Sequence, residues 1–299
     1  MSYILTCIGH AIPQKFLEQL TALLLEKGIT ILKSRNLAKR EIDCIEISLA
    51  TDASFSPASL REIDASLGKT FGIDLVVQDA DAYTLPKRLV VMDLDSTLVQ
   101  AEGIDELAKE AGVGEKVAQI TQRAMNGELI FSDALRERVR LLKGLPVEAL
   151  QKVYERIVFT PGAIEFVSTL KKKNCKTAIL SGGFDYFADR YKEMLKIDYA
   201  FSNRLEIKDN RLTGEIFGEV VDGQKKAFLM EEIARAEGIE LNSVVAIGDG
   251  ANDLPMMKKA GMGIAFNAKP AVRAAAPHTI TQTSLTCILH LLGISEEEI

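Results

Sequence analysis

Two aspartates separated by one residue are the clearest chemical signal in this chain. The segment Asp93-Leu94-Asp95-Ser96-Thr97 stands directly behind the apolar run Leu89–Met92, which is typical of a buried strand. In open α/β sheets, ligands and reacting groups gather at the carboxyl ends of the strands. A carboxylate held beside a metal ion can act as a nucleophile. The pair therefore indicates metal-assisted covalent chemistry at a sheet edge.

Two other interpretations of this pair have to be weighed. A calcium loop requires Gly at its sixth position and Glu at its twelfth. Counted from Asp93, these positions hold Leu98 and Ile104, so the calcium loop is excluded. An ordinary turn after a strand, where Asp is common, stays open for the pair taken alone.

A second candidate feature is the segment Ser181-Gly182-Gly183, which follows the apolar run Lys176–Leu180. A hydroxyl and backbone amides freed by glycine at a helix entrance can form an anion-binding nest. A plain strand-to-helix turn is the alternative for this segment on its own.

More carboxylates follow a later strand. Gly248-Asp249-Gly250-Ala251-Asn252-Asp253 comes directly after Val244–Ile247. Carboxylates from two strands that meet at one sheet edge suit Mg²⁺, which takes oxygen ligands and keeps several waters. Lys226, at the start of the helix before this strand, is either a surface charge or a fixed cation facing the nest.

From residue 88 onward, short apolar runs alternate with helical stretches, which predicts a doubly wound parallel sheet of Rossmann-like α/β type. The rhythm breaks at about residues 102–158, where only helical patterns occur. An insertion of this size directly after the first strand predicts a helical cap over the strand ends. We therefore expect one domain over 88–299 that contains this cap.

The first 80 residues predict a smaller unit of their own. Strand and helix patterns follow one another in the order β-α-β-β-α-β, which is the ferredoxin-like arrangement. Its second helix is predicted from the apolar stripe Leu60, Ile63, Leu67 and Phe71. The polar segment Gln78–Lys87, which contains a proline, is the expected linker to the second domain.

Composition excludes several classes of function. The 299 residues are 47% hydrophobic and 26% charged, with a net charge of −6, which argues against nucleic acid or an anionic membrane as the main partner. The sequence shows neither a membrane-spanning apolar run nor a signal-peptide pattern, so a cytoplasmic location is expected. The four cysteines are scattered through apolar segments and are predicted to be buried free thiols. The three histidines are isolated and support no metal site or catalytic triad.

Taken in order, these motifs resemble those of the haloacid dehalogenase superfamily of phosphohydrolases. The resemblance covers about residues 88–290, with the helical cap placed as in one subgroup, whose members hydrolyse O-phospho-L-serine. Glu102 and the segment Phe131–Pro146 carry this finer resemblance. The first domain is similar to ACT-type regulatory modules, although its turn Gly9–Pro13 lacks the acidic-Arg-Pro-Gly text of the ligand-binding ones.

The resemblance implies a role for each motif residue. Asp93 would attack phosphorus, and Asp95 would be the general acid and base. Mg²⁺ would be held by the carboxylates of Asp93 and Asp249 and by the main-chain carbonyl of Asp95, while Asp253 would order its water shell.

The resemblance also implies how the substrate is held. Ser181, Gly182 and Lys226 would hold the phosphoryl oxygens. Further substrate contacts in the cap and core would be Glu102 on the α-ammonium, Arg138 on the α-carboxylate, Phe131 as a wall of the pocket, and Asn252.

Competing functions stay open at this point. The same residues would serve a phosphotransferase, or a phosphatase for another small phosphomonoester. A catalytically silent amino-acid sensor is a different class, although a silent scaffold would not need to retain Asp93, Asp95, Lys226 and Asp249 together. The expected partner is a small phosphomonoester, and the N-terminal domain is a candidate for homodimer formation.

Overall fold

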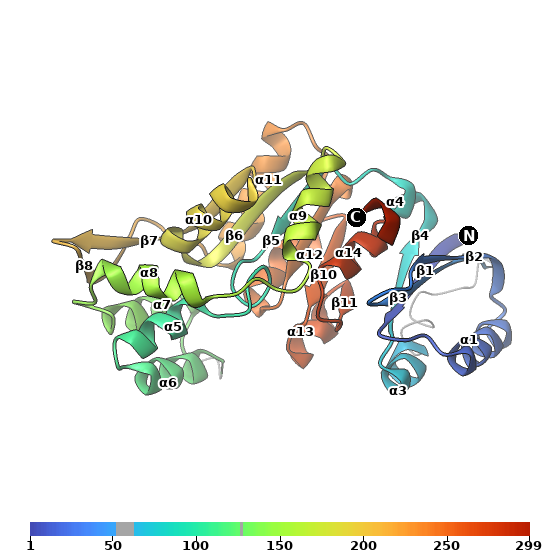
Figure 1. Ribbon diagram of the computed structural model, residues 1–299, viewed down its shortest axis with the longest axis horizontal. Coiled ribbons are helices and arrows are strands. Elements are labelled where there is room, and N and C mark those ends of the chain that lie inside the picture. Colours follow the sequence, from blue (N-terminus) through green and yellow to red (C-terminus); the bar gives the residue numbers. More distant parts are fainter. Residues whose placement is uncertain (52–62, 126–127) are drawn as a thin grey trace.

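The computed structural model describes residues 1–51, 63–125 and 128–299 and holds two β-sheets (Figure 1). The smaller sheet has the strand order β2-β3-β1-β4, and its neighbours are antiparallel. One face of it packs against α1 and α3, because Phe16, Leu20 and Leu24 of α1 are buried on that side with Leu5 and Leu49. Its elements are β1 (Ser2–Gly9), α1 (Gln14–Glu26), β2 (Thr30–Ala38), β3 (Asp43–Ala50), η1 (Asp64–Gly68), α3 (Lys69–Phe71), β4 (Asp74–Asp79) and α4 (Ala80–Thr84).

The larger sheet has the order β11-β10-β9-β5-β6-β7-β8 and is parallel except for the β7–β8 pair. The α/β fold class predicted from the sequence is therefore confirmed. Helices cover both faces, which explains why the strands are continuous apolar runs instead of alternating ones. Its strands are β5 (Leu89–Met92), β6 (Lys176–Phe184), β7 (Tyr199–Lys208), β8 (Arg211–Phe217), β9 (Val244–Gly248), β10 (Met262–Phe266) and β11 (His278–Ile280).

The helices of this part fall into two groups. Four of the helices between β5 and β6 lie at the end of the molecule opposite the small sheet (Figure 1). These are α5 (Gly103–Glu110), α6 (Gly114–Met125), α7 (Phe131–Arg140) and α8 (Val147–Arg156). The helices that follow are α9 (Ala163–Lys172), α10 (Asp185–Leu195), α11 (Gly223–Ala236), η2 (Leu241–Ser243), η3 (Ala251–Asp253), α12 (Leu254–Lys259), α13 (Pro270–Ala275), α14 (Thr286–Leu291) and η4 (Glu296–Glu298).

The α5–α8 group, called the cap below, is tied to the hairpin β7–β8. The amide of Gly144 donates to the carbonyl of Leu212 at 2.8 Å, and the amide of Leu212 donates to Leu145 at 2.9 Å. The sequence patterns predicted neither β8 nor this contact. The edge strand β8 is therefore hydrogen-bonded to the segment between α7 and α8 of the cap.

Buried polar contacts join the small sheet to the larger domain. The carboxylate of Asp74 on β4 accepts from the amide and the hydroxyl of Thr281, each at 2.7 Å, and from the amide of Gln282 at 3.2 Å. The side-chain amide of Gln78 donates to the carbonyl of Leu291 on α14 at 2.9 Å.

The expected linker Gln78–Lys87 contains regular structure. Its first two residues end β4, and residues 80–84 form α4, whose first amides are capped by the Asp79 carboxylate. Leu60 of the predicted helical stripe lies outside the described residues.

The four cysteines are buried and free, as predicted. Within the described ranges, no helix has both the length and the apolar content needed to cross a membrane.

Candidate active site

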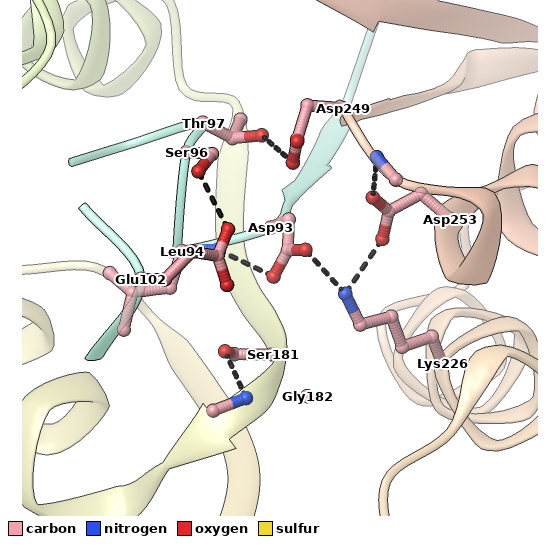
Figure 2. A network of polar contacts seen from close by, with 12 residues as sticks. Asp93, Leu94, Ser96, Thr97, Glu102, Ser181, Gly182, Lys226, Asp249 and Asp253 are labelled. Atoms are coloured by element: carbon pink, nitrogen blue, oxygen red, sulfur yellow. Dashed lines mark hydrogen bonds and ion pairs between the residues drawn. The ribbon is translucent and has the colours of Figure 1, made fainter. Parts of the chain in front are cut away.

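The candidate site lies where three neighbouring strands end. β5 is hydrogen-bonded to β9 on one side and to β6 on the other, and Met92 is in register with both Ile247 and Ile179. Asp93 and Asp249 follow β5 and β9, and Ser181 lies two residues beyond Ile179 in β6. They therefore come to the same edge of the sheet. The order of the strands in the sheet brings the motifs together (Figure 2). This order cannot be read from the sequence pattern of any one strand.

Lys226 is the centre of the charge network. Its side chain is fully buried, and its Nζ lies 2.8 Å from Oδ2 of Asp93 and 2.6 Å from Oδ1 of Asp253 (Figure 2). Although burial by itself lowers the pKa of Lys226, the charges of Asp253 and Asp93 raise it above its ordinary value. The surface-charge interpretation is thereby excluded, and Lys226 is a fixed cation inside the site.

Three carboxylates form a candidate metal centre. Asp93, Asp249 and Asp253 each offer an oxygen atom, and these atoms all lie within 4.8 Å of one another. Burial, with the charges of Asp93 and Asp253, raises the pKa of Asp249 to about 8. Hard oxygen ligands at this spacing fit a divalent cation such as Mg²⁺ or Ca²⁺. A bound cation would favour the ionised form of these groups.

Asp253 has both of its oxygens engaged. Oδ1 contacts Lys226, and Oδ2 accepts from the amide of Gly250 at 3.0 Å. Asp249 is instead approached at 3.4 Å by the hydroxyl of Thr97. This difference favours Asp249 over Asp253 as a direct ligand.

Asp95 lies between the cap and the core. Its Oδ1 accepts from the amide of Gly103, the first residue of α5, at 3.0 Å. Its Oδ2 faces Gly183, where a β-carbon would collide with it. Burial raises the pKa of Asp95 well above its ordinary value, and the charges of Glu102 and Asp93 add to this. A protonated carboxyl group at this position is suited to general acid chemistry.

Ser181 and Gly182 lie within β6 itself, and not in a turn after the strand. Ser181 is fully buried, and its Oγ accepts from the amide of Gly183 at 2.9 Å. A β-carbon on Gly182 would lie 2.8 Å from Cζ of Phe131 and 3.6 Å from Nδ2 of Asn252. The absent side chain thus lets the backbone approach the Phe131 ring and Asn252 closely.

Two charged residues come from the cap. Oε1 of Glu102 accepts from the hydroxyl of Ser96 at 2.6 Å (Figure 2). Arg138 on α7 donates weakly to its own helix and to Thr121 Oγ1, at 3.3 and 3.4 Å. Burial lowers the pKa of Arg138, and the nearby acids, Glu102 among them, oppose this. The two side chains are within electrostatic reach of each other and are suited to a zwitterion.

The structure brings the residues singled out by sequence to one region. Most of them are joined by the contacts above, whereas Arg138 is linked to Glu102 only electrostatically, and their roles stay predictions. Sequence reasoning missed several supporting residues. Thr97, inside the first motif, contacts Asp249, and Thr160 donates to the Thr97 carbonyl at 2.7 Å. No motif or residue spacing in the sequence pointed to Thr160 or to Asn203, which is a buried residue of β7.

Comparison with known proteins identifies the family. A family model described as haloacid dehalogenase-like hydrolase matches residues 90–258. The chain is 38% identical to a phosphoserine phosphatase of Saccharomyces cerevisiae, over 99% of this chain and 98% of that protein. It is 54% identical to a phosphoserine phosphatase of Archaeoglobus fulgidus, over 76% of this chain but only 66% of that protein.

A solved structure agrees. A haloacid dehalogenase family hydrolase from Salmonella enterica serovar Typhi, 33% identical, superposes with a TM-score of 0.87 over the full length of both chains. The chain belongs to the phosphoserine phosphatases of the haloacid dehalogenase superfamily.

Proposed function

We propose that this chain is a Mg²⁺-dependent phosphatase that hydrolyses O-phospho-L-serine to L-serine and inorganic phosphate. The observation that carries the proposal is the contact of Lys226 with Asp93, beside the carboxylate cluster and beneath a cap that supplies Glu102 and Arg138. The identity to phosphoserine phosphatases over nearly the whole chain supports the same substrate.

Asp93 would attack the phosphorus atom and release serine, leaving a phosphorylated aspartate. Lys226 holds Oδ2 of Asp93, and the amide of Leu94 donates to Oδ1 at 2.7 Å, so the carboxylate has a fixed orientation. Asp95 would protonate the departing serine oxygen. The same group would then take a proton from the water that hydrolyses the intermediate.

A bound Mg²⁺ supplies charge neutralisation between the nucleophile and the phosphoryl group. The Asp93 and Asp249 carboxylates and the Asp95 carbonyl would hold it, with Asp253 outside this set. Ser181, Gly182 and Lys226 would hold phosphoryl oxygens, which is a preorganised electrostatic arrangement.

Substrate choice would fall to the cap. Glu102 suits the α-ammonium group, and the planar guanidinium of Arg138 suits the α-carboxylate. Phe131, packed against Gly182, would exclude water, and Asn252 lies beside the same glycine.

A panel assay tests the function. Phosphate release would be measured from O-phospho-L-serine, phosphothreonine, phosphoethanolamine and p-nitrophenyl phosphate, with Mg²⁺ or with EDTA. We expect phosphoserine to be preferred and EDTA to abolish release. Transfer to an added alcohol such as homoserine would indicate a phosphotransferase, and amino-acid binding without any release would indicate a sensor.

We further propose that residues 1–80 form an ACT-like unit for regulation or homodimer formation, ahead of a phosphatase domain over 88–299 with its cap at about 102–158. The strand order β2-β3-β1-β4 supports the ferredoxin-like part of this proposal. Sedimentation of the full chain would test the dimer. A cytoplasmic location stays a prediction.

A further inference from the structure

The pairing of β6 with β7 is interrupted beside the phosphoryl-binding residues. Leu180 pairs with Phe201, and the next pair is Phe184 with Asn203, so four steps along β6 match two steps along β7. Two extra residues on one strand form a bulge, and bulges leave backbone groups without ladder partners. The bulged segment is Ser181–Gly183.

The side chain of Asn203 replaces the missing ladder partner. Asn203 is buried, and its Nδ2 donates to the carbonyl of Gly182 at 2.8 Å and to that of Gly183 at 3.3 Å. Its Oδ1 accepts from the amide of Val221 at 2.8 Å. Because the main-chain amide of Val221 is a donor, it must face Oδ1 of Asn203. The Nδ2 group of the same side chain therefore faces the bulge.

Asn203 thereby joins two segments of the site. Val221 immediately precedes Asp222, whose carboxylate accepts from the amide of Lys225 at 2.9 Å and so caps α11, the helix that carries Lys226. One side chain therefore contacts both the bulge that contains Ser181 and the residue that precedes the N-cap of the helix carrying Lys226.

The orientation of the bulge determines what the Ser181 hydroxyl can do. The carbonyl of Gly182 and the amide of Gly183 belong to one planar trans peptide, so they point in opposite directions. With the carbonyl held by Asn203, the amide points to Ser181 Oγ and donates to it at 2.9 Å. A hydroxyl that accepts from this amide keeps its own proton to donate elsewhere.

We infer that Asn203 is a positioning residue for the phosphoryl group, acting through the Gly182–Gly183 peptide on the Ser181 hydroxyl. The inference rests on the proposed function of this site. Asn203 itself need not touch the substrate, and its effect on catalysis should therefore depend on the presence of Ser181.

The test is a double-mutant cycle with Asn203→Asp and Ser181→Ala. Asn203→Asp keeps an oxygen that can accept from the Val221 amide. It replaces the Nδ2 donor by a carboxylate oxygen, which would face the carbonyl oxygens of Gly182 and Gly183. We expect kcat/KM to fall roughly tenfold to a hundredfold in the wild-type background, and by less than about threefold in the Ser181→Ala background. The cycle would be measured on the phosphomonoester that the wild-type protein hydrolyses best, so it does not depend on phosphoserine being that substrate.

A pH profile gives a second readout that a merely structural role would not move. The introduced carboxyl group can donate to the Gly182 carbonyl only when it is protonated. The difference in kcat/KM between Asn203→Asp and the wild type should therefore become smaller as the pH is lowered. Gln78→Glu is the matched control, because Gln78 is also a buried amide that donates to a main-chain carbonyl, at the distant domain contact. It should leave kcat/KM near the wild-type value.

Equal losses in the two backgrounds, with the same pH dependence as the wild type, would overturn the inference. If Asn203→Asp does not melt cooperatively, Asn203→Ser, which is neutral and smaller, would be taken through the same cycle with the same expectation. If the wild-type protein releases no phosphate from any substrate, the proposed function fails. The affinity for inorganic phosphate would then be measured over the same four proteins, and additive losses would again contradict the inference.

Discussion

Nζ of Lys226 lies 2.8 Å from Oδ2 of Asp93, inside the protein and with almost no exposure of either group. The same ammonium also contacts Asp253, so one buried cation balances two carboxylates. Desolvation of isolated charges is costly, and such a group is tolerated only when its partners are in place. Lys226 is therefore expected to contribute both to the stability of the fold and to the reaction at Asp93.

Lys226→Met should destabilise the protein by about 3–5 kcal/mol, because it leaves Asp93 and Asp253 as buried carboxylates without their cation. Phosphatase activity should be lost as well. Urea unfolding with and without Mg²⁺ would measure the cost, and Mg²⁺ should return part of the stability by binding the folded state. Lys225→Met is the control, since Nζ of Lys225 pairs at 2.6 Å with the exposed Glu219 and should contribute less than about 1 kcal/mol. Similar losses for the two variants would contradict the argument.

The two aspartates of the first motif should be essential for different reasons. Asp93→Asn should abolish turnover and leave no phosphorylated protein, because the nucleophile is removed. Asp95→Asn should fold normally but slow both release of the alcohol and hydrolysis of the intermediate. Rapid-quench measurement of phosphoenzyme and of phosphate separates these outcomes. Full activity of Asp93→Asn would exclude a phosphorylated Asp93.

Ca²⁺ should inhibit the enzyme in competition with Mg²⁺. Ca²⁺ accepts six to eight oxygen ligands and can bind both oxygens of one carboxylate. Mg²⁺ requires a nearly ideal octahedral coordination geometry. In the Asp93–Asp249 cluster, Ca²⁺ could engage both oxygens of Asp93 and leave none free to attack. Initial rates over a grid of the two ions would reveal the competition. Equal activity with either ion would show that Asp93 is not both ligand and nucleophile.

Arg138→Lys should separate substrate recognition from chemistry. A lysine replaces the planar bidentate contact of the guanidinium with a point charge. For phosphoserine, transition-state stabilisation should fall by on the order of 1.5–3 kcal/mol, or roughly tenfold to a hundredfold in kcat/KM. Phosphoethanolamine lacks the carboxylate and should be a poor substrate that is little affected. Arg136→Lys, on the same helix, is the control and should not discriminate between the two substrates. A uniform loss on both substrates in Arg138→Lys would place this residue in the fold or the phosphate site.

His290 should make the wild-type protein sensitive to mild acid. It is buried on α14, its Nδ1 lies 2.8 Å from the Ile294 carbonyl, and burial lowers its pKa below the ordinary value of 6.5. Below pH 6.5 the unfolded chain therefore binds a proton that the folded state does not, so stability falls as the pH drops toward the folded pKa. His290→Gln lacks this titration, and its Tm relative to the wild type should rise between pH 7.5 and pH 5.5. The exposed His10→Gln is the control, and a constant difference for His290→Gln would reject the prediction.

Much of the fold follows from patterns within short stretches of chain. The buried strand β5 is a continuous apolar run with Asp93 directly behind it, and β9 repeats this arrangement ahead of Asp249. Helical patterns likewise placed α5, α6, α7 and α8 within the interval of about residues 102–158. These patterns are reliable because burial of a strand or of one helix face requires apolar residues at fixed local spacing.

Other features could not be read from local patterns. β8 is a short strand that alternates between buried and exposed residues at the sheet edge, and nothing near it in sequence shows that it pairs with β7 and supports the cap. Asn203 lies in the middle of β7, and nothing near it in the sequence distinguishes it from other asparagines. Its role appears only when the β6 bulge turns two carbonyls toward it.

The sequence by itself determined which residues could do the chemistry. It also placed Asp93 and Asp249 directly behind apolar strands and Lys226 near the start of a helix. The tertiary structure alone decided that β9, β5 and β6 are neighbours, that Lys226 contacts both Asp93 and Asp253, and that Asn203 holds the bulge. The reason is physical: strand and helix signals come from residues close in the chain. Strand order, bulges and buried ion pairs depend on contacts between segments tens to more than a hundred residues apart, where burial and hydrogen bonding are satisfied only by the whole fold.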